Sequence, residues 1–233
     1  MVFCTTKIEN VACLKRLPRA FFSRDGITVA KELLGKILVH ETEVGTIRGI
    51  ITEVESYMGV EDKGSHTYGG RRTERTEPMF HIGGTSYVYL IYGMYSCMNI
   101  TSGEDGDPQA VLLRSVIPAD EESAQRMLEL RLRELNRKQV KKNKSPYTQG
   151  NYPSNLKKHF ADGPGKMCIA MGITRADNDL DMVESDTFYV AEGLEIAPEI
   201  IQVGKRIGID YAEEAADFLW RFFIRDEDLC VGN

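Results

Sequence analysis

The 233-residue sequence lacks the marks of several common protein classes. Its five cysteines are odd in number and widely scattered, with no CxxC pair and no histidine at zinc-finger spacing, which argues against a disulfide framework and a structural zinc. No apolar run approaches the roughly 18 residues that span a bilayer, and charged residues interrupt the N-terminus where a secretion signal would need an apolar core. We therefore expect an intracellular protein with no membrane association, no metal ion and no cofactor.

A surplus of positive charge is also missing, because the formal net charge is −6. Proteins that bind nucleic acid usually carry a basic surplus, so this value argues mildly against such a partner. The electrostatic field at a binding groove is nevertheless set by local patches of charged residues rather than by the total charge of the protein. Basic residues gather at 71–75 and 137–144, whereas acidic residues concentrate at 177–199 and 210–228. The charge is therefore polarised along the chain.

Nothing in the sequence divides the chain into several domains, since it has no internal repeat, low-complexity tract or Gly/Ser linker. We expect a loose leader at 1–15, followed by one domain at 16–233 that acts as a monomer.

Hydrophobic periodicity predicts one helix at 28–34 with Thr28 as its N-cap, another at 120–143, and a short one opened by residues 163–166. Alternating and β-branched patterns predict strands at 36–43, 46–56, 85–92, 96–101, 110–117, 188–190, 202–209 and 221–224. Strands outnumber helices and mostly follow one another in hairpins. This pattern indicates an α+β fold, a single mixed domain on a curved, largely antiparallel β-sheet with peripheral helices.

Two acidic residues and a tyrosine form the first candidate site. Glu53, Glu55 and Tyr57 are spaced by two, so on a strand they share one face. For an arbitrary Glu-x-Glu, the ordinary explanation is a solvent-facing stripe. Here the strand runs into the glycine-rich segment 58–84, which places Glu55 at a rim, where a rigid strand aims a group and a loop shapes a pocket. An ionised carboxylate in such a place could act as a general base on water.

Four closely spaced tyrosines follow. Tyr87 and Tyr89 share a strand face, and a tyrosine-rich core would account for Tyr87 and Tyr95. Tyr92 stands beside Gly93 in a tight hairpin turn. A ring held out stiffly in this way suits a wedge inserted between base pairs.

Three further polar residues each allow two interpretations. His66 in the glycine-rich segment is either a hydrogen-bonding spacer or part of the site. Asn99 is either a satisfied core amide or a group that meets an exocyclic group of a bound base. Arg114 follows Val-Leu-Leu, and it would be unusual to bury without an anionic partner.

Several long motifs, in order, resemble the alkyladenine (3-methyladenine) DNA glycosylase family, and together they cover nearly all of 16–225. They are Arg16-Leu17 with Phe21-Phe22, Glu55-Ser56-Tyr57, Gly69-Gly70-Arg71-Arg72-Thr73, Met79-Phe80, Tyr87 to Tyr95 with Cys97-Met98-Asn99, Val111 to Arg114, Gly163 to Cys168, Arg206 to Ile209, and Trp220-Arg221-Phe222.

The resemblance implies an enzyme of base excision repair that flips a damaged purine out of double-stranded DNA and hydrolyses its N-glycosidic bond. The lesions would be of the 3-methyladenine, ethenoadenine and hypoxanthine class. The protein would work inside the cell with the DNA, in the cytoplasm or nucleoid of a bacterium or in the nucleus of a eukaryote. No lysine lies among the matched pocket positions, so a monofunctional enzyme that leaves an abasic site is expected.

The resemblance and the local positive charge together suggest roles for ten residues of this chain. Glu55 is similar to the base that activates water, and Arg114 to a residue that contacts the backbone beside that water. The expected walls of the base site are Tyr57, His66 and Tyr89, with Asn99 excluding guanine by its 2-amino group. Residues expected to contact DNA are the wedge Tyr92, Met94, Arg71 and Arg75.

Two other functions remain open from the residues alone. A non-catalytic module could stack a single-stranded base on Tyr57 and Tyr89, and a sugar hydrolase could use Glu53 and Glu55 as a carboxylate pair. The chain also departs from the family in three places. The turn at 103–108 is long, the segment 119–160 is longer and more basic, and Leu219 replaces a proline before Trp220.

Overall fold

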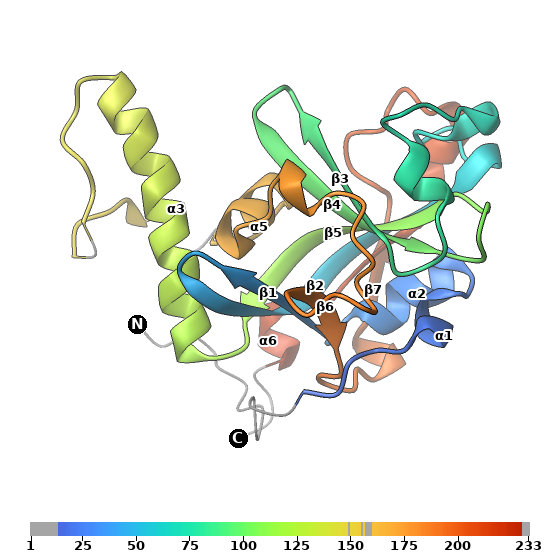
Figure 1. Cartoon of the computed structure of the whole chain (residues 1–233), viewed down its shortest axis with the longest axis horizontal. Helices are drawn as coiled ribbons and strands as arrows, with labels where there is room; N and C mark the ends of the chain where they lie inside the picture. The colour runs from blue at the N-terminus through green and yellow to red at the C-terminus, as the bar shows by residue number, and fades with distance from the viewer. Residues whose placement is uncertain (1–13, 149, 155, 157–159, 230–233) are drawn as a thin grey trace.

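A computed structural model describes residues 14–148, 150–154, 156 and 160–229. The leader expected at 1–15 therefore lies almost wholly outside the described residues. The core of the fold is a curled antiparallel sheet with helices around it (Figure 1). Its strands are β1 (Ile37–Thr42), β2 (Gly45–Met58), β3 (Ser86–Ile91), β4 (Tyr95–Ser102), β5 (Gln109–Pro118), β6 (Phe188–Ala191), β7 (Gln202–Gly204) and β8 (Arg221–Phe223). The predicted α+β class is confirmed.

The 14-residue strand β2 organises the sheet. One edge pairs with β1 over residues 45–50 and then with β8 over residues 53–55, and the other edge pairs with β5. The register with β5 shifts between Ile51 and Val54, a bulge that bends the strand and increases its twist. The main path of the sheet runs β3-β4-β5-β2-β1-β6, and β7 joins through β8.

The helices cap the sheet and connect its strands. They are α1 (Arg19–Phe22), α2 (Gly26–Leu33), α3 (Glu121–Lys141), α5 (Pro164–Met171) and α6 (Asp226–Leu229). Helix α2 begins earlier than predicted, because the Asp25 side chain, rather than Thr28, accepts the first free N–H groups, those of Ile27 and Thr28. Helix α3 matches its prediction, with Asp120 as N-cap. No helix in the described ranges is long and apolar enough to cross a membrane.

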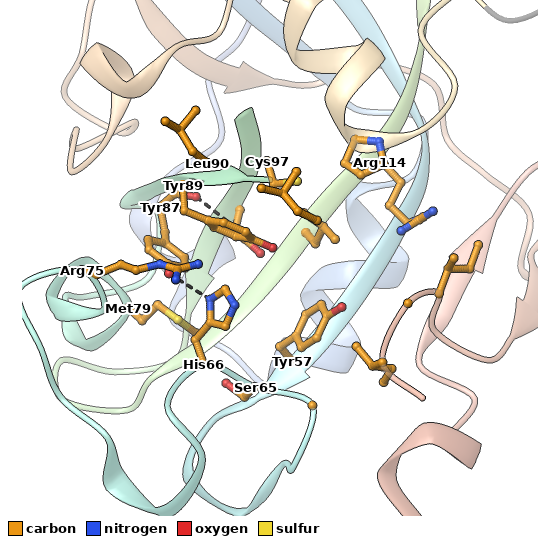
Figure 2. A pocket seen from close by; sticks show the side chains of 18 of the residues that line it. Tyr57, Ser65, His66, Arg75, Met79, Tyr87, Tyr89, Leu90, Cys97 and Arg114 are labelled. Carbon is orange, nitrogen blue, oxygen red and sulfur yellow. Dashed lines mark hydrogen bonds between the residues drawn. The ribbon is translucent and has the colours of Figure 1, made fainter. Parts of the chain in front are cut away.

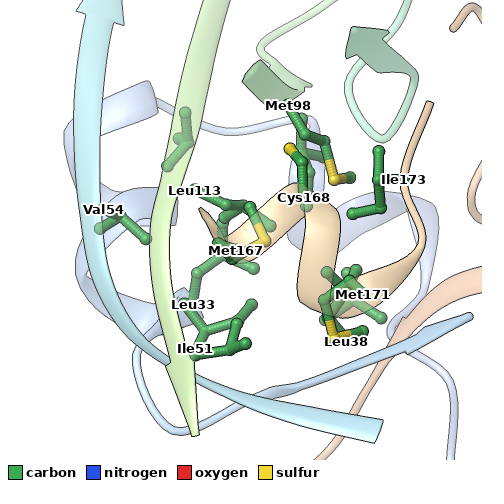
Figure 3. Close-up of a cluster of buried hydrophobic side chains, with 14 of the residues drawn as sticks. Leu33, Leu38, Ile51, Val54, Met98, Leu113, Met167, Cys168, Met171 and Ile173 are labelled. Carbon is green, nitrogen blue, oxygen red and sulfur yellow. The ribbon is translucent and has the colours of Figure 1, made fainter. Parts of the chain in front are cut away.

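The main hydrophobic core lies between α5 and the sheet. Figure 3 shows side chains of α5 packed against Val54 of β2, Met98 of β4 and Leu113 of β5. These side chains are fully buried, and burial of each stabilises the fold by about 1.5–3 kcal/mol. Because side chains alternate along a strand, the neighbours of Val54 and Leu113 face the opposite side of the sheet. That side carries the charged residues of the candidate site.

The glycine-rich segment between β2 and β3 has little regular structure, as predicted. It contains three short 3₁₀ helices, η2 (Gly59–Glu61), η3 (Tyr68–Gly70) and η4 (Glu77–Phe80). Three further 3₁₀ turns lie later in the chain, η5 (Arg175–Asp177), η6 (Pro198–Ile200) and η7 (Glu213–Asp217). The strand predicted at 202–209 is wrong beyond Gly204, because the chain leaves the sheet there to line a cavity.

Candidate active site

A cavity of about 370 Å³ opens against side chains of β2, β3, β4 and β5. Its walls come from these strands, from the segment 58–84 and from residues 207–211 (Figure 2). It brings together seven of the residues selected from the sequence: Tyr57, His66, Arg75, Tyr89, Tyr92, Asn99 and Arg114. Arg71 and Met94 are exposed and do not line it.

The Glu55 carboxylate lies directly behind this lining, with no exposed surface. Three residues that line the cavity hold it in place. The Tyr57 hydroxyl donates to Oε2 at 2.9 Å, the Ile207 backbone N–H donates to Oε1 at 2.8 Å, and Arg114 Nη1 lies 3.2 Å from Oε1. The carboxylate therefore contacts the cavity through the polar groups of its immediate neighbours.

The position of Glu55 corrects the expectation of a rim. The strand continues to Met58, and Glu55 pairs with Leu112 of β5 on one side and Arg221 of β8 on the other. Backbone hydrogen bonds on both sides hold a strand more rigidly than a loop junction does. The candidate base is thus fixed in the middle of the sheet.

Burial raises the pKa of Glu55, since a charged carboxylate loses its hydration there. The Arg114 guanidinium, the Ile207 N–H and the Tyr57 hydroxyl act in the opposite direction, because all three favour the ionised form. The pKa of Tyr57 is raised well above its ordinary value by burial and by Glu55, so its hydroxyl stays protonated as a donor. The site holds a carboxylate that is more basic than an exposed glutamate.

Arg114 is buried and, as expected for a buried arginine, it has anionic partners, Glu53 and Glu55. Its Nε lies 2.9 Å from Glu53 Oε1, and Glu53 is also bound by Arg221 Nη1 at 3.0 Å. Glu53 and Glu55 therefore share Arg114 on one side of the cavity, and Glu53 does not line it. Such an arrangement does not place two carboxylates on either side of one sugar bond, as a glycan hydrolase requires.

Aromatic rings form the other walls. His66 lies 4.7 Å from Tyr89 between ring centroids, edge to face, and Tyr87 lies 5.3 Å from Tyr89. His66 Nδ1 shares a hydrogen bond of 2.9 Å with the Tyr87 hydroxyl. Figure 2 shows the Tyr57 ring across the cavity from His66 and Tyr89. The space between them is bounded by flat apolar faces.

The pKa of His66 is lowered to about 4, first by burial and then by two nearby arginines, Arg75 and Arg71. The imidazole is therefore neutral at neutral pH. A neutral ring does not repel a positively charged ligand. Arg75, expected from the sequence to contact DNA, lies at the cavity with its guanidinium 5.1 Å from the centre of the Tyr89 ring.

Tyr92 occupies the tip of the β3–β4 hairpin. Tyr92 and Gly93 have positive φ angles of 52° and 65°, and the Met94 N–H donates to the Ile91 carbonyl at 3.1 Å. This β-turn matches the twist of a hairpin, and glycine suits its second position. The Tyr92 side chain is 83% exposed and Met94 66% exposed. Two apolar side chains thus project from a short, defined turn beside the cavity.

Asn99 and Cys97 form part of the cavity lining from β4. The Asn99 amide is buried and donates through Nδ2 to the Tyr87 carbonyl at 3.1 Å, so its orientation is set by the backbone of β3. Cys97 was not selected from the sequence. Burial raises the pKa of its thiol to about 11, so the thiol is protonated and packs as an apolar group.

Sequence reasoning also missed the residues that support Tyr57. The Arg206 guanidinium lies 4.7 Å from the centre of the Tyr57 ring and forms a buried ion pair with Asp62, whose Oδ1 is 2.8 Å from Nη2. Arg206 also donates to the backbone carbonyls of Ser56 and Ala215. This network joins the end of β2, the segment 58–84 and the segment after β7. The available signal for Arg206 was its place in the motif Arg206 to Ile209, which is part of the resemblance but assigns no role to the arginine.

Potential metal ligands are dispersed in the part of the chain that the structure describes. Within it, no three His, Cys, Asp or Glu side chains gather closely enough to hold an ion. The chemistry considered below uses the side chains around the cavity.

Comparison with known proteins gives a consistent result along the chain. A family model described as methylpurine-DNA glycosylase matches residues 20–228. Three bacterial relatives are named as candidate 3-methyladenine DNA glycosylases. The relative from Clostridium perfringens (strain 13) is 46% identical over 212 residues, which are 91% of this chain and 96% of that protein. Those from Clostridium acetobutylicum and Desulfitobacterium hafniense are 44% and 42% identical, over 90% and 91% of this chain and 94% and 97% of their own lengths.

Proposed function

Because the chain belongs to the methylpurine-DNA glycosylase family, which hydrolyses N-glycosidic bonds, we propose that it releases alkylated or deaminated purines from double-stranded DNA. The observation that carries the proposal is a buried carboxylate directly behind a cavity walled by aromatic rings. A flipped purine is flat, and a cavity of about 370 Å³ has room for one base.

The damaged base binds between the Tyr57 ring and the rings of His66 and Tyr89. Stacking on these faces tolerates several purines, because every base has a π face. A base that alkylation has made positively charged gains a cation–π attraction of about 1–2 kcal/mol for each good contact. The neutral state of His66 supports this role, since a protonated imidazole would oppose a cationic base.

Glu55 activates the water. The Arg114 guanidinium and the Ile207 backbone both touch the carboxylate and line the cavity, so we place the attacking water against these two residues. The water oxygen bonds to C1′ of the sugar as the bond from C1′ to the base nitrogen breaks, and the bonding electron pair leaves with the base. Glu55 takes the proton of the water. A cationic base leaves as a neutral molecule, which lowers the barrier.

Other residues adjust selectivity and DNA binding. Asn99, held by the Tyr87 carbonyl, excludes guanine by its 2-amino group. Tyr92 fills the space in the stack that the flipped base vacates, with Met94 beside it. Arg71 and Arg75 attract the phosphate backbone, and Arg75 also borders the base.

The reaction ends with an abasic site. None of the described lysines lines the cavity, so a Schiff base and a subsequent strand-cleaving step have no nucleophile there. We expect the enzyme to work as a monomer at the DNA.

The test is a base-release panel. The protein is incubated with duplexes that contain 3-methyladenine, 1,N6-ethenoadenine or hypoxanthine, and free base and abasic sites are measured against an undamaged duplex. Release from at least one lesion, with an intact strand before alkali, is expected. Binding without release from any of them would favour a non-catalytic module that stacks single-stranded bases on Tyr57 and Tyr89.

A further inference from the structure

The C-terminal end of α3 carries a charge opposite to that of the whole protein. Residues 137–144 contain five lysines and arginines and no acidic residue, whereas the chain has a net charge of −6. Glu134, one turn earlier, pairs with Arg137 at 2.9 Å and with Lys138 at 3.3 Å. Among the residues that the structure describes, the other three cations of 137–144 have no such neutralising partner.

Lys141, Lys142 and Lys144 are exposed. Across residues 14–148 and the later described ranges, no acidic side chain forms an ion pair with any of the three. Lys141 and Lys142 follow Lys138 at spacings of three and four, so they lie about one turn, roughly 5 Å, further along the same side of the helix. The helix end is therefore a short strip of free positive charge.

This strip begins at the hairpin that carries Tyr92. Lys138 Nζ donates to the Tyr95 hydroxyl at 3.0 Å and lies 5.0 Å from the centre of its ring. A groove of about 380 Å³ separates α3 from the hairpin, with Met94 and Tyr95 on one side and Arg133 and Arg137 on the other. In Figure 1 the C-terminal end of α3, the β3–β4 turn and the segment 58–84 all point to the same upper edge of the molecule.

We propose that residues 137–144 bind the phosphate backbone of the duplex beside the lesion, while the hairpin turn enters the duplex and the cavity holds the base. The inference rests on the proposed function, because it takes DNA as the partner. Phosphates of one strand are about 3.4 Å apart along the duplex axis, so one helical turn of lysines covers one or two of them. An acidic protein thereby gains a local site for DNA during its search for damage.

Lysines near a helix C-terminus also stabilise the helix itself through its dipole. The two roles differ in what they predict. A role limited to the helix affects the melting temperature and leaves DNA binding independent of these residues. A role on DNA changes the dependence of binding on salt, because each phosphate contact releases counterions.

The test variant is Lys141→Gln with Lys142→Gln, since glutamine keeps the helix propensity of lysine. The matched control is Lys15→Gln with Lys31→Gln, which removes two exposed lysines from other parts of the chain. Dissociation constants for an undamaged duplex are measured by fluorescence anisotropy at salt concentrations between about 50 and 200 mM, together with melting temperatures. Loss of two contacts should reduce the slope of log K against log salt by about 1.8 and weaken binding by about 10- to 60-fold near 0.1 M salt.

The control should keep the slope of the unmodified protein. A test variant with that same slope would overturn the proposal, and a lowered melting temperature with an unchanged slope would assign these lysines to helix stability alone. Base release is measured separately on the unmodified protein. Its absence would contradict the proposed function, while the slope on undamaged DNA would still decide the role of the strip.

Discussion

Glu55→Gln separates the chemistry of the site from its packing. The glutamine carbonyl oxygen can accept from the Ile207 N–H and from Arg114, as Oε1 does in the native protein. Its amide can donate to the Tyr57 hydroxyl, which then accepts rather than donates. Every hydrogen bond of the carboxylate is therefore retained, while its charge and its basicity are lost.

The stability of this variant follows from the direction of the pKa shift. Burial raises the pKa of Glu55, so the fold gains stability from the protonated form at low pH and loses that contribution as pH rises through the raised pKa. A neutral glutamine keeps this contribution at pH 7. Arg114 retains Glu53 at 2.9 Å, so no buried charge is left unpaired. We expect the free energy of unfolding to rise or to change by less than about 1 kcal/mol.

Excision should fall about 10²- to 10⁴-fold, the usual contribution of a general base. The assay is single-turnover release of hypoxanthine from a duplex, accompanied by thermal unfolding and by binding to a duplex with an abasic analogue. Glu53→Gln is the control, since Glu53 shares the strand face and Arg114, whereas the hydrogen bonds from the cavity-lining Tyr57 and Ile207 go to Glu55. Excision by Glu55→Gln that is close to that of the unmodified protein would remove Glu55 from the mechanism. Loss of both folding and binding would show that its charge is structural.

Three further outcomes test other parts of the site. Arg114→Gln removes the positive charge that most lowers the pKa of Glu55, so that pKa should rise. Because activity needs the ionised carboxylate, the loss of excision at low pH should move to higher pH. An unmoved pH–rate profile would contradict the contact between Arg114 and Glu55. The His66 ring should titrate in NMR spectra with a pKa of about 4, and titration near its ordinary value of about 6.5 would show that the ring is not buried as described. Tyr92→Ala should weaken binding of a damaged duplex more than binding of a single strand, with little change in melting temperature because the side chain is 83% exposed. Equal losses on both substrates would argue against a wedge.

The parts of the fold that sequence predicts well depend on local patterns. Alternation places Glu55 and Tyr57 on one face of β2, and it places Tyr87 and Tyr89 on one face of β3. The members of each pair lie beside each other as expected. The glycine after Tyr92 predicts the hairpin turn for the same reason, since turn chemistry is set by two or three residues. Helix α3 also follows from its own periodicity.

The depth of Glu55 could not be predicted in this way. It depends on β5 pairing with one edge of β2 and on β8, more than 160 residues away in sequence, pairing with the other. A local pattern shows which face a residue takes but not how many strands lie beside it. The position of Arg75 at the cavity and the ion pair between Arg206 and Asp62 are equally non-local.

The buried position of Glu55 also explains why the chain departs from the sheet after Gly204. A buried carboxylate is stable only when donors from other segments replace its lost water. Arg114 supplies one from β5, and the Ile207 backbone supplies another that would not be free for this role if 205–209 continued as a paired strand. The break in β7 thus directs an N–H to Glu55 and brings Ile207 to the cavity wall. The environment of Glu55 is complete only after two distant segments, β5 and residues 205–209, have docked on β2, so the basicity of Glu55 is a property of the whole fold.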